Sequence, residues 1–129
     1  PNHATDLFGD LKLAAILHNG AGCDPLALLP IDALRMATAN GGRALGRKTG
    51  VIAEGYEADL ILVDFSHLNL TPCHSVISNL AYAAHGSDVC MNMARGKVIY
   101  KDGDFLTIDL ERVRREVADY ALPLLFQNN

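Results

Sequence analysis

The stretch from Gly46 to Asp64 constrains the fold more than any other part of the chain. It spaces three glycines, Gly46, Gly50 and Gly55, ahead of the apolar run Leu60-Ile61-Leu62-Val63. Glycine adopts positive φ without a steric penalty, so this spacing suits a chain that turns sharply, forms a strand and turns again. The β-branched residues of the run, with an aspartate on either side, predict a short buried strand. The stretch therefore marks a change from helical to β-rich architecture.

The hydrophobic pattern on both sides of this stretch predicts a mixed α/β chain. Apolar residues at helical spacing indicate helices, and short β-branched runs indicate strands. Helices are expected near residues 6–18, 31–40, 75–84 and 109–121, and strands near residues 59–64, 89–94 and 97–101. A glycine turn at Arg95-Gly96 should join the last two strands in a hairpin. Residues 66–72 are expected to be extended.

Capping and breaking residues predict where the helices begin and end. Thr5 or Asp6 should cap the first helix, and Asp109 should cap the last. Asn19 or Gly20 should end the first helix in a left-handed conformation, since both residue types tolerate it. Asn40-Gly41-Gly42 is expected to break the second helix, and Pro123 to end the last one.

Composition and charge narrow the classes of function. A net charge of −4 provides no basic stripe for phosphates, which argues against a nucleic-acid partner. No apolar run reaches the roughly 20 residues of a membrane span, so no membrane association and a cytoplasmic location are expected. The chain opens with Pro1 and not Met, which suggests a piece of something longer. The three cysteines, Cys23, Cys73 and Cys90, are widely spaced, so we expect buried or incidental thiols and no disulfide or zinc ribbon.

The histidines do not have the spacing of a metal centre. A metal hydrolase usually pairs ligands closely, as in His-x-His, and no such pair occurs among His3, His18, His67, His74 and His85. His18 and His85 are expected at helix C-termini, where the helix dipole favours a cation. His67 and His74 flank a proline-containing loop and are either site residues or hydrogen-bonded loop residues. We therefore assign no metal ligand in this chain.

The acidic and hydroxyl residues likewise point to no catalytic machinery. Asp24 with Asp32, and Asp102 with Asp104, lie at turns and helix starts, where aspartate makes local hydrogen bonds. Asp59 is expected to accept backbone N–H groups within its own turn. The glycines match no phosphate-binding motif, and no serine has a nucleophile-elbow context. We assign no catalytic residue, and substrate-binding residues remain unknown.

Several motifs along the chain resemble the C-terminal portion of the amidohydrolase superfamily. The glycine turn followed by Ala58-Asp59, a strand and a closing aspartate is one of them. Asn2, Asp6, Leu7 and Phe8 match the segment that follows the last barrel strand in deaminase-type members. The other matching segments are ALRMATANGGRALG (33–46), HLNLTP (67–72), SNLAYAAHGSDV (78–89), RGKVIYKDG (95–103) and LTID (106–109). The set is most similar to the chlorohydrolase and 5′-methylthioadenosine/S-adenosylhomocysteine deaminase type.

The resemblance implies a fold, a division of the chain and a chemistry. Residues 1–46 would be the last helices of a (β/α)8 barrel, and residues 47–129 the C-terminal strands of a small composite β-sandwich with a terminal helix. The full enzyme would hydrolyse a C–N or C–Cl bond on a heteroaromatic ring. It would use a divalent metal, zinc or iron, whose ligands all precede Pro1, so this chain alone would bind no metal and be inactive. Dihydroorotase- and imidazolonepropionase-like chemistries share the scaffold and stay open.

Two other interpretations of the same chain are a non-catalytic scaffold or interaction module derived from such an enzyme, and a complementing subunit of a split enzyme. All three predict a partner, because helix 6–18 is apolar on too many sides to face water. The partner would be the missing N-terminal part of the enzyme or a second copy of the chain in a homo-oligomer. Leu11 and Leu17 are expected at that interface.

Overall fold

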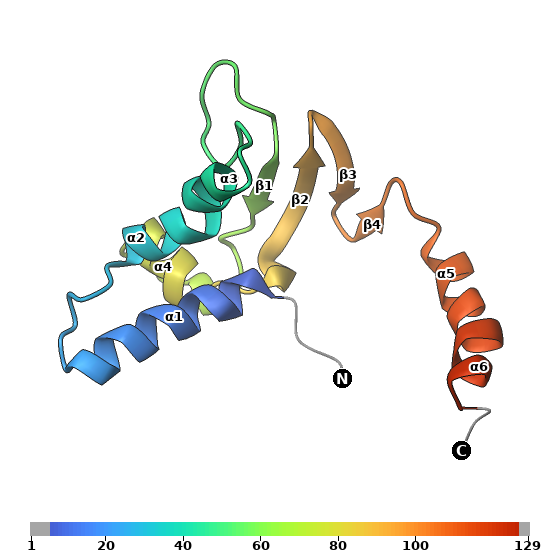
Figure 1. Ribbon diagram of the computed structural model, residues 1–129, viewed down its shortest axis with the longest axis horizontal. Helices are drawn as coiled ribbons and strands as arrows, with labels where there is room; N and C mark the ends of the chain where they lie inside the picture. Colours follow the sequence, from blue (N-terminus) through green and yellow to red (C-terminus); the bar gives the residue numbers. More distant parts are fainter. Residues whose placement is uncertain (1–5, 127–129) are drawn as a thin grey trace.

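The computed structural model describes residues 6–126 and contains a helical half, a four-stranded antiparallel sheet and a terminal helix. Three helices gather on one side of the sheet: α1 (Leu7–Gly22), α2 (Pro30–Arg35) and α4 (Val76–Tyr82) (Figure 1). On the other side, apart from them, lie α5 (Leu110–Glu116) and α6 (Leu122–Phe126). This order, helices first and strands after residue 58, confirms the mixed α/β pattern predicted from the sequence.

The first helix, α1 (Leu7–Gly22), begins where predicted and ends later. Asp6 caps it, since the side chain accepts a hydrogen bond from the backbone N–H of Phe8. The predicted end at Asn19 or Gly20 is wrong: Cys23 is the left-handed C-cap, with φ of 47°, and its N–H bonds the carbonyls of Asn19 and Gly20. A further helical turn therefore lies beyond His18.

The second helix passes through the glycines that were expected to break it. It comprises α2 (Pro30–Arg35), a π-helical turn η1 (Met36–Asn40) and α3 (Gly41–Ala44), and helical backbone angles continue across each junction. Gly42 is buried against Thr49, where an added Cβ would overlap the carbonyl oxygen and lie 3.1 Å from the carbonyl carbon. The absent side chain thus permits a close approach of loop and helix, and does not end the helix.

The helical core is small and consists mainly of alanine. α4 (Val76–Tyr82), capped by Ser75, packs against α1 and α2. Leu11, Ala15, Ala33 and Ala81 form the buried cluster. The buried face of α4 is centred on Ala81, whereas Val76 at its start is 54% exposed.

The loop of residues 46–58 turns as its glycines predicted. Gly46, Gly50 and Gly55 have φ of 64°, 79° and 78°. Gly50 also lies against the backbone of Thr38, so that a Cβ there would come within 2.8 Å of the nitrogen of Ala39. Positive φ and close packing coincide at that residue, which leaves glycine as the suitable residue type.

The sheet has the strand order β1-β2-β3-β4, every neighbouring pair being antiparallel. The strands are β1 (Leu60–Val63), β2 (Val89–Ala94), β3 (Lys97–Lys101) and β4 (Asp104–Phe105). The hairpin predicted at Arg95-Gly96 is confirmed, with φ of 49° and 78° at its two turn residues. Asp102 and Gly103 make the next turn, also with positive φ.

The strand β1 and the segment after it differ from the prediction. β1 was expected to be buried, yet Ile61 is 47% and Leu62 is 54% exposed. Segment 66–72 was expected to be extended, but it contains a 3-10 turn, η2 (Leu68–Leu70), which buries Leu70 completely. A second 3-10 turn, η3 (Gly86–Asp88), connects α4 to β2.

The terminal helix continues through Pro123, where the sequence predicted an end. It consists of α5 (Leu110–Glu116), the π-helical turn η4 (Val117–Ala121) and α6 (Leu122–Phe126). Pro123 falls in the first turn of α6, where its missing N–H is tolerated. Asp109 caps α5 as expected, accepting from the N–H of Arg112 at 2.9 Å. No helix within residues 6–126 combines the length and apolar character needed to cross a membrane.

Candidate functional site

The most site-like cluster joins His67, Asn69 and Asp88 at the end of the sheet. Nδ1 of His67 lies 2.6 Å from Oδ1 of Asp88, and the Asn69 amide donates to Oδ2 of Asp88 at 2.8 Å. The backbone N–H of His85 also donates to Oδ2 at 2.9 Å. Asp88 is only 3% exposed and ends η3, whereas His67 and Asn69 belong to the segment around η2. The cluster therefore ties together two segments that are distant in the sequence.

The electrostatics favour a charged pair in this cluster. The hydrogen bond to Asp88 raises the pKa of His67 above its ordinary value, and Asp64 adds to the effect. Burial opposes ionisation of Asp88, but the bonds from His67, the His85 N–H and Asn69 together lower its pKa. The pKa of Asp64 is also lowered, chiefly by the backbone N–H of Ser66. The raised pKa of His67 and the lowered pKa of Asp88 both favour an ion pair between the two side chains.

This arrangement suits a structural clamp better than a catalytic base. Nδ1 of His67 is engaged with Asp88, and Nε2 lies 3.8 Å from Oδ2 of Asp64, so the two carboxylates favour the protonated ring, which cannot accept a proton from a substrate. Within residues 6–126, no hydroxyl or thiol is hydrogen-bonded to this imidazole. The same part of the chain contains no group of three His, Cys, Asp or Glu residues placed to hold a metal ion.

A second polar cluster fastens the glycine loop to the hairpin turn. Oδ1 of Asp59 accepts from the backbone N–H of Arg95 at 2.8 Å, and Oδ2 accepts from the hydroxyl of Thr49 at 2.9 Å. Arg47 pairs with Glu57 and lies 3.4 Å from Asp59, and Arg95 contacts Glu57 at 3.3 Å. The pKa of Asp59 is lowered, first by the bond from Arg95 N–H. The expectation that Asp59 bonds within its own turn is wrong, because its partners lie in two other segments.

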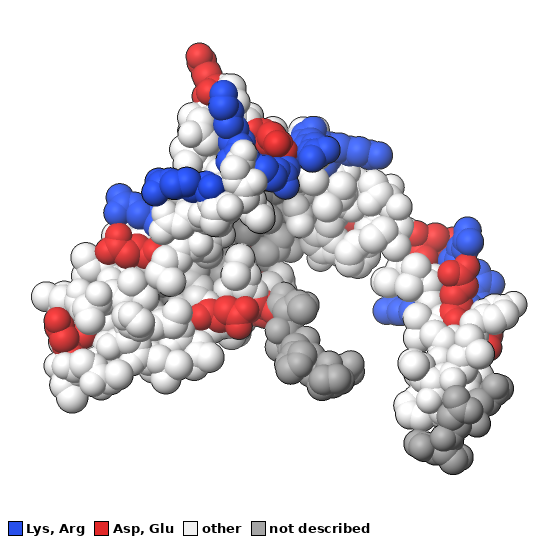
Figure 2. All heavy atoms as spheres, in the orientation of Figure 1, with Lys and Arg blue, Asp and Glu red and all other residues white. Residues whose placement is uncertain are grey.

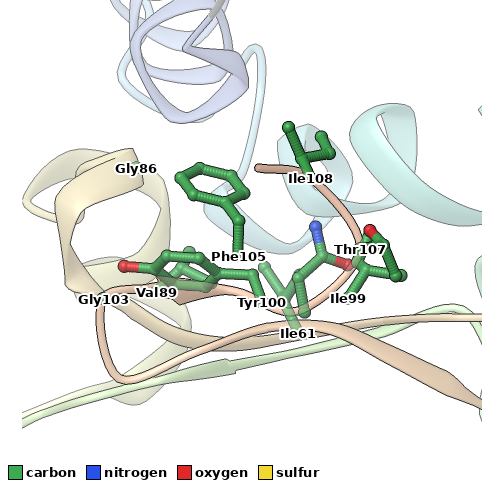
Figure 3. A pocket seen from close by; sticks show the side chains of 10 residues that line it. Ile61, Gly86, Val89, Ile99, Tyr100, Gly103, Phe105, Thr107 and Ile108 are labelled. Carbon is green, nitrogen blue, oxygen red and sulfur yellow. The ribbon is translucent and has the colours of Figure 1, made fainter. Parts of the chain in front are cut away.

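One cross-strand row of side chains lines a hollow on one face of the sheet (Figure 3). The pairings Ile61–Asn92, Asn92–Tyr100 and Tyr100–Phe105 place these four residues side by side across all four strands. The hollow has a volume of about 490 Å³, and the rings of Tyr100 and Phe105 lie 5.2 Å apart. Its lining is mostly apolar, with no His, Cys, Asp, Glu, Lys or Arg, which suits contact with an apolar segment.

The remaining candidate residues are dispersed. His18 lies a full turn before the end of α1, and His85 lies beyond the end of α4, so neither caps a helix C-terminus as predicted. His74 is exposed between η2 and α4, and His3 lies outside the described residues. Asp24 and Asp102 lie in turns, and Asp32 pairs with Arg35 on the helix surface. The cysteines are free, and Cys23 and Cys73 are exposed, not buried.

Sequence reasoning missed Asp88 and Asn69. The spacing His85-Gly86-Ser87-Asp88 places a carboxylate three residues after the N-cap of a 3-10 turn, where it can reach back to the backbone N–H of that cap residue. That spacing could have indicated a capping box around η3. A capping box usually begins with serine or threonine, however, and here the first position is His85. No local pattern connected Asp88 to His67, because the two are 21 positions apart.

Surface charge is uneven over the molecule. Lys and Arg side chains gather along one edge, over the glycine loop and the turn of the β2–β3 hairpin, while uncharged side chains dominate the helical half (Figure 2). Exposed apolar residues include Leu13, Ile16 and Leu17 of α1, each at least 51% exposed. They also include Leu122, Leu124, Leu125 and Phe126 of the terminal helix.

Curated relatives of this chain are enzymes of two related kinds. The 5′-deoxyadenosine deaminase of Methanosarcina mazei is 41% identical over 128 residues, covering 99% of this chain and 30% of the relative. The 5-methylthioadenosine/S-adenosylhomocysteine deaminase of Pelotomaculum thermopropionicum is 42% identical over 125 residues, covering 96% of this chain and 29% of the relative. The chain thus spans about 30% of the length of the relatives that it matches.

Solved structures with the same arrangement come from the same group. An adenosine deaminase from Xanthomonas campestris with bound zinc has a TM-score of 0.85 at 32% identity, over 92% of this chain and 27% of that chain. An atrazine chlorohydrolase from Arthrobacter aurescens complexed with zinc has a TM-score of 0.79 at 28% identity, over 87% of this chain and 25% of that chain. The family model described as the amidohydrolase family matches residues 2–99. The chain therefore belongs to the amidohydrolase family, and within it resembles the deaminases and chlorohydrolases.

Proposed function

We propose that this chain is the C-terminal part of a metal-dependent amidohydrolase that removes an amino group from the purine ring of a nucleoside. The relatives named as 5′-deoxyadenosine and 5-methylthioadenosine/S-adenosylhomocysteine deaminases support this substrate class, at 41% and 42% identity. The atrazine chlorohydrolase, at 28%, supports hydrolysis of a C–Cl bond on a heteroaromatic ring as the next candidate. In either reaction water adds its oxygen to the ring carbon, and ammonia or chloride leaves.

The observation that carries this proposal is the large surface that the chain exposes. Its accessible surface is 9687 Å², whereas a compact monomer of 13.9 kDa would expose about 6,700 Å². The excess, on the order of 3,000 Å², is the size of an obligate interface. Within residues 6–126 the buried apolar side chains are Leu11, Leu70 and four alanines. Such a core is too small for an independent domain, which disfavours the stand-alone module and supports a permanent partner.

We propose the N-terminal part of the same enzyme as that partner. The match covers only 30% of the Methanosarcina mazei relative and 27% of the Xanthomonas campestris structure, which leaves room in each for a large additional part. This supports a single longer polypeptide over a homo-oligomer of the chain alone. Residues 1–46 would be the final helices of the barrel, with the exposed side of α1 against barrel strands. Residues 47–129 would be the β-sandwich arm, with the row Ile61, Asn92, Tyr100 and Phe105 covered by strands of the partner.

The described residues do not fit the metal that the proposed enzyme would need. The histidine with the most developed surroundings, His67, has both nitrogens against carboxylates, and no suitable three-residue group exists within residues 6–126. We therefore assign the zinc or iron ligands to the N-terminal part. The present chain would contribute scaffold, and no chemical step is assigned to its side chains.

A chimaera tests the proposal directly. In the Methanosarcina mazei 5′-deoxyadenosine deaminase, the segment that aligns with this chain over 128 residues would be replaced by this chain. The truncated relative alone would be the control. We expect the chimaera to release ammonia from 5′-deoxyadenosine, and the truncated control to be inactive. A folded, zinc-loaded chimaera with no deaminase or triazine dechlorinase activity would contradict the proposal. Sedimentation of the isolated chain as a folded monomer would favour the stand-alone module instead.

A further inference from the structure

The carboxylate of Asp6 makes two hydrogen bonds that connect distant parts of the chain. Oδ1 accepts from the N–H of Phe8 at 3.0 Å, which caps α1. Oδ2 accepts from the backbone N–H of Gly86 at 3.1 Å, across a sequence separation of 80 residues. Gly86 begins η3, so one side chain holds the start of α1 and the start of η3 together.

The segment that Asp6 reaches is itself fixed to the sheet. Asp88, at the other end of η3, binds His67 and Asn69 through its side chain, and its carbonyl accepts from the N–H of Asp64 at 2.8 Å. β2 begins at the next residue. Asp6 is therefore one end of a continuous set of polar contacts that runs from the entrance of α1 to β1 and β2.

The side chains that cap the other α-helices of the described chain, Ser75 and Asp109, do not make such a connection. Ser75 bonds only the N–H of Ser78, three residues away, and Asp109 bonds only the N–H of Arg112. A local cap uses one oxygen, and serine, asparagine and aspartate are about equally suited to it. The link to Gly86 needs a second acceptor oxygen, which aspartate has and serine lacks.

We propose that Asp6 is a positioning residue of the intact enzyme, an inference that rests on the proposed function. The family model matches from residue 2, so the segment that enters α1 belongs to the enzyme's common domain. Anchored at Phe8 and Gly86, Asp6 fixes where the start of α1 meets the segment that leads into β2, and thereby orients the part of the enzyme that would pack on α1. Loss of the Gly86 bond frees the entrance of α1, and displacements of this kind reduce the rate of the chemical step.

The variant Asp6→Ser in the chimaera tests this inference, with Asp109→Ser as the matched control. Serine keeps a local cap at both positions, but only Asp6→Ser removes a link between distant segments. We expect Asp6→Ser to lower kcat about tenfold with little change in KM, and to accelerate hydrogen exchange of the Gly86 amide. Asp109→Ser should change neither kcat nor that exchange rate.

The outcomes separate this inference from the proposed function. An inactive parent chimaera would contradict the proposed function. The hydrogen-exchange rate of the Gly86 amide, compared between the parent and Asp6→Ser, would then still decide whether Asp6 holds the start of α1 against η3. If the parent is active but Asp6→Ser leaves kcat unchanged, Asp6 is a cap and has no positioning role. An unchanged Gly86 exchange rate would likewise overturn the inference, because the bond would then contribute nothing in solution.

Discussion

Replacing Gly50 by alanine should destabilise the arm more than the same change at Gly55. Both glycines have nearly the same φ, 79° and 78°, so alanine meets the same backbone strain at each. Around Gly55 no atom lies within 4 Å of the added Cβ. At Gly50 the Cβ would lie 2.5 Å from the carbonyl carbon of Thr38 and 2.8 Å from the nitrogen of Ala39, and both are backbone atoms that cannot rotate away.

The magnitudes follow from these two terms. Left-handed backbone costs alanine about 1–2 kcal/mol, and the reduced entropy of the unfolded chain returns about 0.4–1 kcal/mol. Gly55→Ala should therefore lower the free energy of unfolding by about 1 kcal/mol. The overlap at Gly50 forces a backbone shift worth a further 1–3 kcal/mol or so, for a total loss of about 2–4 kcal/mol.

Urea titration of the chimaera and its variants measures the difference. Gly42→Ala completes the set, because it tests steric overlap alone. Gly42 has helical backbone angles, so alanine meets no left-handed strain there, but its Cβ would overlap the backbone of Thr49. The expected order of destabilisation is Gly50→Ala first, with Gly42→Ala and Gly55→Ala both smaller. Equal losses at Gly50 and Gly55 would refute the close contact between the loop and the second helix.

Three further predictions concern the clamp, the core and the interface. Because the pKa of His67 is raised in the folded protein, the stability that its ion pair contributes should be fully present below the ordinary histidine pKa and should be lost as pH rises through the raised pKa. Because the pKa of Asp88 is lowered, the stability that Asp88 contributes should be present above the ordinary aspartate pKa and should be lost as pH falls through the lowered pKa. His67→Gln should remove the alkaline loss from urea titrations, and an unchanged profile would contradict the ion pair. Leu70→Ala should cost about 2–5 kcal/mol, whereas Leu68→Ala, at a residue 90% exposed, should cost under about 0.5 kcal/mol; similar losses in urea would contradict the assigned packing. Leu17→Asp should stop the chain copurifying with a coexpressed N-terminal part, while Ile52→Asp, on the charged edge, should not; equal effects would contradict the interface on α1. Leu11 is a core residue, 6% exposed, so Leu11→Asp should unfold the helical half instead of testing the interface.

Local chemistry in the sequence predicted the turns and strands well. Positive φ at Gly46, Gly50 and Gly55, and the hairpin at Arg95-Gly96, follow from what glycine permits at tight turns. The cap at Asp109 follows from hydrogen bonding over three residues. In each case the residues that decide the structure lie next to one another in the chain, so the sequence alone carries the information.

The errors occurred where distant contacts override local preference. Gly41 and Gly42 do not break the second helix, because the helix gains a close contact between Gly42 and Thr49. Asp88, the centre of the most developed polar cluster, acquires its role from partners around positions 67 and 69. No local pattern specifies such contacts.

The outer edge of β1 has a consequence for the fate of this sheet when no other chain covers it. Within residues 6–126 β1 pairs with β2 on one side, and the other side is an open row of backbone donors and acceptors. Its four residues, Leu60 to Val63, carry no charge, proline or glycine, the features that usually keep an edge strand from recruiting other chains. If proteolysis released this sheet without a covering partner, it would therefore aggregate edge to edge through this strand, or be degraded first.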